Sequence, residues 1–79
     1  MRLVTRQVIY PDGDSQEIQH TLRIDELVDL NGVPLPLPLV NPRVIAYRVY
    51  RISTAEERGE EITSYYLALL RLDELLGLT

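Results

Sequence analysis

The chain contains no cysteine and a single histidine, His20, and this limits how 79 residues can be held in one fold. Chains this short bury a modest share of their surface, and small domains usually add disulfides, a structural metal or oligomerisation. Without cysteine there is no disulfide and no thiolate zinc site, and one imidazole cannot build a histidine-rich site. We therefore expect a single domain over residues 1–79, stabilised by its core or by self-association, with no metal and no cofactor.

The core of such a domain has to be largely aliphatic. Hydrophobic residues make up 46% of the sequence, which is typical of a globular protein, but phenylalanine and tryptophan are absent. Leucine, valine, isoleucine and five tyrosines must therefore fill the core, and the tyrosine hydroxyls need water or a polar partner.

The first thirty residues predict a β-hairpin. The segment from Leu3 to Tyr10 is rich in β-branched and aromatic residues, and the residues from Pro11 to Gly13 then favour a tight turn. The segment from Glu17 to Ile24 alternates apolar and polar residues, which is typical of a half-buried strand. The residues from Asp25 to Leu30 fit either one helical turn or a short strand that ends at the turn Asn31–Gly32.

Three prolines at alternate positions mark the segment from Val33 to Leu39. Proline lacks an amide hydrogen, so this segment cannot be helical and can lie only at a sheet edge or in an extended connection. In an extended chain Leu35, Leu37 and Leu39 point to one side. We expect them to cover an apolar face of their own domain or of a second copy.

The segment from Val44 to Ile52 has apolar residues on both faces and is therefore expected to be a central strand. The residues after it fit two structures. In a long helix, Ser53 and Glu56 would form a capping box, and apolar residues would recur every three or four positions. In a β structure, a hairpin loop would precede a second strand. We favour the strand, because a central strand needs a partner on each side.

In this β interpretation Glu57 to Glu60 is the hairpin loop, Ile62 to Leu70 is the strand, and only Leu72 to Leu76 is helical. The sequence thus predicts a mainly β fold: a small antiparallel sheet or partly open barrel of about five strands with a short C-terminal helix. The alternative is an α+β fold, with three to four strands packed under one long C-terminal helix. Met1 to Arg6 lack the apolar run of a signal peptide, and no stretch could span a bilayer, so we expect a cytoplasmic protein.

The residues that carry chemistry do not form a catalytic pattern. The sequence has no glycine-rich phosphate loop, nucleophile elbow or metal-ligand spacing. We interpret His20 as a structural residue on the apolar face of a strand, hydrogen-bonded at the sheet margin. The acids Asp12, Asp14 and Glu17 suit a turn and lack the further ligands of a calcium loop. We therefore expect that the protein is not an enzyme.

Two groups of residues are candidates for binding a partner instead. The first is a run of arginines and tyrosines near one strand, since aromatic rings stack on bases and arginine binds phosphate. Strict alternation places Arg48 and Tyr50 on one face and Tyr47 and Arg51 on the other, and the net charge of −4 argues against nucleic acid. The members are Arg43, Tyr47, Arg48, Tyr50 and Arg51.

The second group consists of leucines in segments that are expected at edges of the fold. Its members are Leu35, Leu37, Leu39, Leu72, Leu75 and Leu76. They favour a non-enzymatic protein-interaction module that self-associates or binds another protein, without membrane contact. The alternative function is a small-barrel nucleic-acid-binding domain that uses the arginine–tyrosine strand.

Overall fold

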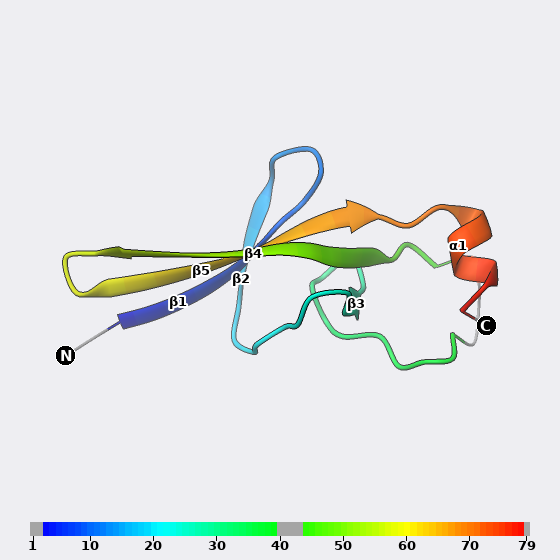
Figure 1. Ribbon diagram of the computed structural model, residues 1–79, viewed down its shortest axis with the longest axis horizontal. Helices are drawn as coiled ribbons and strands as arrows, with labels where there is room; N and C mark the ends of the chain where they lie inside the picture. Colours follow the sequence, from blue (N-terminus) through cyan, green and yellow to red (C-terminus); the bar gives the residue numbers. More distant parts are fainter. Residues whose placement is uncertain (1–2, 40–43, 79) are drawn as a thin grey trace.

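The computed structural model describes residues 3–39 and 44–78, which form one five-stranded sheet and a short helix (Figure 1). The strands lie in the order β2-β1-β5-β4-β3, in a sheet that curls into a half-barrel. This confirms the mainly β prediction with its short C-terminal helix. The elements are β1 (Leu3–Ile9), β2 (Ser15–Ile18), β3 (Leu27–Val28), β4 (Tyr47–Glu57), β5 (Glu60–Leu69) and α1 (Leu72–Leu76).

Strand β5 is the centre of the sheet. It pairs antiparallel with β4 along its whole length and parallel with β1 from Glu60 to Tyr66. The sheet is therefore mixed, whereas the sequence predicts antiparallel pairing throughout. Side-chain alternation identifies the faces of a strand but not the direction in which two distant hairpins join. The long helix of the α+β alternative does not form, because β5 occupies the residues it would need.

Both predicted hairpin turns are present. Between β1 and β2, the Tyr10 N–H donates to the Asp14 carbonyl at 2.8 Å, and the Asp12 carboxylate accepts the Asp14 N–H at 3.0 Å. Between β4 and β5, Arg58 and Gly59 form a two-residue turn with φ values of 48° and 81°. Positive φ at both central residues is the geometry that suits the twist of a two-residue hairpin.

The strand predicted from Glu17 to Ile24 is much shorter in the structure. Strand β2 begins at Ser15 and ends at Ile18, and the chain then bends away from the sheet. Leu22 still lies in the core, at 5% exposure, but it reaches the core from a loop. Alternation therefore marked Ile18 and Leu22 correctly as buried, but Ile24 is 51% exposed. Pairing stops at Ile18 because the chain bends there, although β1 continues to Leu3.

The strand predicted from Val44 to Ile52 begins at Tyr47 and continues to Glu57. It is flanked on both sides for only a short stretch, because β3 has two residues and pairs with Tyr47 and Arg48 alone. Among the described residues, no strand lies on that side of β4 after Arg48. The strand order places β4 inside the sheet, as predicted, but only its first residues are flanked by strands on both sides.

The core consists of two clusters that lie against opposite faces of the sheet. Leu27 and Val28 are successive residues of β3, and they contribute to different clusters. We call the face of Val28 the inner face and the face of Leu27 the outer face. The inner cluster contains Val8, Ile18, Leu22, Val28, Val49, Tyr65 and Leu67. The outer cluster, where α1 and the proline-rich segment meet the sheet, contains Leu27, Leu39, Ala46, Leu70 and Leu75.

Away from these clusters the sheet continues as a three-stranded projection (Figure 1). We call it the arm and define it as residues 3–6, 50–57 and 60–64. None of the residues in these ranges is buried, and the molecule is 44 Å long but only 22 by 17 Å across. Among the residues described, no helix is long and apolar enough to cross a membrane.

Candidate functional site

A β-bulge in β4 decides which side chains of the arginine–tyrosine strand lie together. Val49 pairs with Leu67 of β5, and the next pair joins Arg51 to Tyr66, so Tyr50 is an extra residue. Val49 is fully buried on the inner face, and successive residues of β5 point to opposite faces. Arg51 therefore lies on the outer face. The face that strict alternation predicts for Arg51 is wrong, because the bulge adds one residue.

On the outer face, Tyr50 and Arg51 meet the ring of Tyr66, and we call these three residues the Tyr50 cluster. The Tyr50 and Tyr66 ring centroids are 6.4 Å apart, with ring planes at 53°. The guanidinium carbon of Arg51 lies 5.3 Å from the Tyr66 centroid, within the range of a cation–π contact. Tyr50 is 57% exposed, so the cluster is open to a planar partner from solvent.

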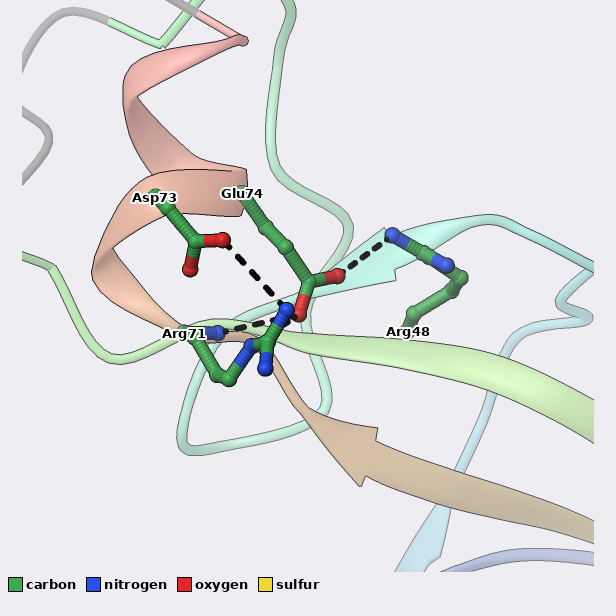
Figure 2. Close-up of polar contacts among 4 residues, drawn as sticks. All are labelled: Arg48, Arg71, Asp73 and Glu74. Atoms are coloured by element: carbon green, nitrogen blue, oxygen red, sulfur yellow. Dashed lines mark hydrogen bonds and ion pairs between the residues drawn. The ribbon is translucent and has the colours of Figure 1, made fainter.

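Arg48 lies on the same face, but its guanidinium group forms an ion pair with Glu74 of helix α1 (Figure 2). Its Nη2 donates to Oε2 of Glu74 at 2.9 Å, and the other carboxylate oxygen of Glu74 lies 3.3 Å from Nε of Arg71. Arg71 also contacts Asp73 at 3.3 Å. Arg48 therefore ties the start of α1 to β4, and its contribution to a ligand site is correspondingly reduced.

The remaining members of the predicted binding group lie elsewhere. Tyr47 is half-buried on the inner face, and its ring contacts Tyr10 edge-on with centroids 5.3 Å apart. Arg43 lies outside the described residues. Tyr66 was missed by the sequence reasoning, since only the bulge brings it opposite Tyr50 and Arg51. The one feature of the sequence that marks Tyr66 is that it directly follows Tyr65, in the segment predicted to be the neighbouring strand.

The two tyrosine rings of the inner face also form the wall of an open groove of about 540 Å³. The Tyr10 hydroxyl lies 2.7 Å from the Leu30 carbonyl and 3.1 Å from Oε1 of Gln16. Burial raises the pKa of the Tyr10 phenol above its usual value, and Tyr47 and Asp29 act in the same direction. The phenol is therefore neutral at physiological pH and serves as a hydrogen-bond donor that fixes this wall.

The predicted leucine surface divides between the core and the solvent. Leu39 and Leu75 are buried in the outer cluster, and Leu35 packs against it, so these three are not a surface for a partner. Leu37 is 57% exposed, because the chain bends at Leu37 and Pro38 and the extended pattern ends there. The exposed members are Leu37, Leu72 and Leu76.

The open edge of β4 is a feature that the sequence analysis did not identify. The backbone of Val49 is satisfied on that side, since its N–H donates to the Glu26 carbonyl at 3.0 Å and its carbonyl accepts the Asp25 N–H at 2.8 Å. In the described part of the chain, no strand pairs with that side of residues 50–57. An unpaired edge of this length can accept another β-strand.

The single histidine has a structural position. The Nε2–H of His20 donates to the Gly32 carbonyl at 2.8 Å, which confirms the expected hydrogen bond, although His20 lies in a bend and not in a strand. Within residues 3–39 and 44–78, no three His, Asp or Glu side chains are grouped to hold a metal ion. Asp12 accepts a backbone hydrogen bond in its turn, as a turn residue should.

A family model described as "Uncharacterised Treponema protein" matches residues 5–78, which is nearly the whole chain. No curated protein and no solved structure matches.

Proposed function

The chain belongs to the family described as "Uncharacterised Treponema protein", and we propose that it is a non-enzymatic protein-interaction module that binds a second copy of itself. The family description names no activity, so the proposal rests on the arm. Its β4 edge is open, and every residue of positions 50–57 except Ser53 is exposed. Small domains without disulfides commonly gain stability by oligomerising. The cysteine-free composition supports a cytoplasmic location for the module.

Exposed apolar side chains on both faces of the arm support the same proposal. Leu3 and Val4 are adjacent in β1, so they point to opposite faces, and they are 59% and 46% exposed. Tyr50 and Ile52 of β4 are 57% and 38% exposed. Several exposed apolar side chains on one narrow projection support an interaction site there. A second copy that covers the arm would remove these side chains from water.

Self-association predicts that the mass of the protein in solution depends on its concentration. Size-exclusion chromatography with light scattering should give a mass that rises above the 9.1 kDa chain mass toward twice that value as the concentration increases. A complex stabilised by about 5–6 kcal/mol has roughly half of its chains paired at about 100 μM. Dilution should return the 9.1 kDa monomer. A monomer over the whole concentration range would contradict the proposal.

The Tyr50 cluster favours a second candidate function, binding of single-stranded nucleic acid. The exposed ring of Tyr50 and the half-buried ring of Tyr66, beside Arg51, can stack on bases, and such stacking contributes about 1–3 kcal/mol per base. The net charge of −4 opposes this function, so any binding should weaken steeply as salt is added.

The second candidate predicts that labelled single-stranded DNA binds at low salt and that the Tyr50 cluster carries the binding. Tyr50→Ala should weaken binding by roughly fivefold or more, in line with the loss of one stacking contact. Arg51→Ala should also weaken it. Arg23→Ala is the matched control, because Arg23 is exposed but lies outside the arm. Fluorescence anisotropy measures the effect, and equal losses for Arg23→Ala and Arg51→Ala would indicate unspecific attraction only.

A further inference from the structure

We propose that β4 pairs antiparallel with β4 of a second copy, about a two-fold axis at Thr54, so that Arg51 of each copy faces Glu57 of the other. This inference rests on the proposed self-association and specifies its geometry. Three observations carry it: the open β4 edge, the pattern of charges along that edge, and a pair of like charges at the tip of the arm.

The edge is open at the residues that the pairing requires. Hydrogen bonds to Asp25 and Glu26 satisfy the Val49 backbone, and no described strand lies on that side of β4 after Val49. The edge also projects from the body of the molecule, since residues 50–57 belong to the arm (Figure 1). A second copy can therefore approach it without meeting the helix or the proline-rich segment.

Symmetry restricts the register of such a pair. A two-fold axis perpendicular to the sheet leaves the outer faces of both copies on one side and the inner faces on the other. Residues that are paired across the new interface must therefore both belong to the inner face or both to the outer face. Centring the axis on Ser53 places Arg51 opposite Ala55, and centring it on Ala55 places Arg51 opposite Gly59. Only the register centred on Thr54 among these three gives Arg51 an acidic partner.

That acidic partner is Glu57, and it lies on the outer face together with Arg51. The two positions are six residues apart on β4, with regular pairing to β5 between them, from Arg51↔Tyr66 to Glu57↔Glu60. The two-fold axis produces the pair twice. Opposite charges that face each other across strands stabilise a sheet by roughly 0.2–1 kcal/mol per pair. At an exposed interface such pairs define register and partner more than affinity.

The pairing also accounts for an unfavourable feature of the single chain. Glu57 and Glu60 face each other directly in the β4–β5 hairpin, and like charges in that position are destabilising. Neither forms an ion pair with a residue that the structure describes. Arg51 of the second copy would lie beside Glu57 and reduce this repulsion. The side chains nearest the axis are small, since Ser53 would face Ala55.

Charge exchange tests the register. In a homodimer, Arg51→Glu places two glutamates opposite each other, and Glu57→Arg places two arginines opposite each other. Each variant alone should weaken self-association at least about tenfold, because two attractive pairs become repulsive. An equimolar mixture of the two variants should restore association to within about threefold, because every facing pair in the mixed dimer is again of opposite charge.

Matched controls are Arg23→Glu and Glu17→Arg, which change the charge by the same amounts at exposed positions outside the arm. They should associate as the natural chain does. Sedimentation equilibrium measures the dissociation constants, and circular dichroism checks that every variant is folded. Weakened variants that are not restored by mixing would overturn the register.

A cysteine at the axis gives an independent test, because the chain has no cysteine of its own. Facing Cα atoms in an antiparallel pair are about 4.5–5.5 Å apart, which is within disulfide range. Thr54→Cys should therefore form a disulfide-linked dimer under mild oxidation. Ser53→Cys should not, because it faces Ala55, and its own copy across the axis lies beyond that range.

The outcomes separate this inference from the proposed function. If the natural chain forms dimers but neither charge reversal nor Thr54→Cys behaves as expected, the edge pairing is overturned and self-association stands. If the natural chain is monomeric at all concentrations, both are overturned. Restoration by mixing together with selective cross-linking at Thr54 would establish the pairing.

Discussion

At Gly32 the chain needs a residue without a side chain, for two separate reasons. Its φ is +78°, a conformation that residues with a Cβ rarely adopt, and a Cβ there would lie 3.2 Å from Cγ2 of Ile18 and 3.5 Å from Cγ2 of Val8. Its carbonyl also accepts the hydrogen bond from His20. The turn after β3 is therefore held directly against the inner cluster.

Alanine substitutions at Gly32 and Gly13 together separate the free-energy cost of a positive φ from the cost of a steric contact. We expect Gly32→Ala to lower the free energy of unfolding by about 2–5 kcal/mol, from left-handed strain of roughly 1–2 kcal/mol plus overpacking of about 1–3 kcal/mol. Gly13→Ala is the control, because Gly13 has φ +96° but a Cβ at that position would have no neighbouring atom within 4 Å. Urea denaturation should show a smaller loss of stability for Gly13→Ala than for Gly32→Ala. Equal losses of stability would contradict a steric contact at Gly32.

Single residues were predicted best where their role is local. The turn residues Asp12 and Gly59 behave as the sequence suggests, because each role depends on neighbours along the chain. The partners of Arg48 and Tyr47 were not predictable. Arg48 meets Glu74 of α1, and Tyr47 meets Tyr10 of the segment after β1, across distances that no local pattern encodes.

Among the elements, helix α1 depends most on its surroundings. It has five residues, which is too short for a stable isolated helix. Leu75 is 5% exposed and packs in the outer cluster, while Glu74 holds Arg48 and Arg71 (Figure 2). Tertiary contacts therefore maintain α1, and the buried leucine of this helix, Leu75, docks it on its own domain.

We expect Leu75→Ala to lower the free energy of unfolding by about 2–4 kcal/mol, since it leaves a cavity in the outer cluster. Leu72→Ala removes the same atoms from a side chain that is 60% exposed and should change stability by less than about 0.5 kcal/mol. Thermal and urea denaturation of both variants measure the difference. A similar effect of the two substitutions would show that α1 is not docked through Leu75.

The β4–β5 hairpin shows what element-level prediction can and cannot do. The turn at Arg58–Gly59 and the strand after it were predicted because the preceding strand needs partners, since the local pattern also fitted a long helix. The helix bounds Leu72–Leu76 are confirmed. The bulge at Tyr50 was not predicted, because alternation assumes one residue per pairing position. That one residue moves Arg51 to the outer face and creates both the Tyr50 cluster and the charge pattern on the edge.

At the scale of the whole molecule, the core and the arm have different characters. The core uses both faces of a small sheet, with aliphatic side chains and Tyr65 buried in two clusters. The arm carries three strands beyond these clusters and has no buried residue in the ranges that define it. A projection with an open edge and apolar side chains gains stability when another chain covers it, and this connects the shape of the molecule to the proposed self-association.

The sequence by itself determined the local chemistry of this protein. Composition removed disulfides and thiolate metal sites, and the turn residues located both hairpins, whereas the apolar pattern after Ser53 fitted both a strand and a long helix. These properties follow from interactions between near neighbours, or from the absence of a residue type altogether.

Only the tertiary structure decided how those pieces combine. The parallel pairing of β1 with β5, the short reach of β3 and the bulge at Tyr50 each depend on contacts between residues far apart in the sequence. Side-chain alternation does not specify strand direction, strand neighbours or an inserted residue. The open edge from Tyr50 to Glu57, on which the proposed function rests, is therefore a property of the assembled sheet.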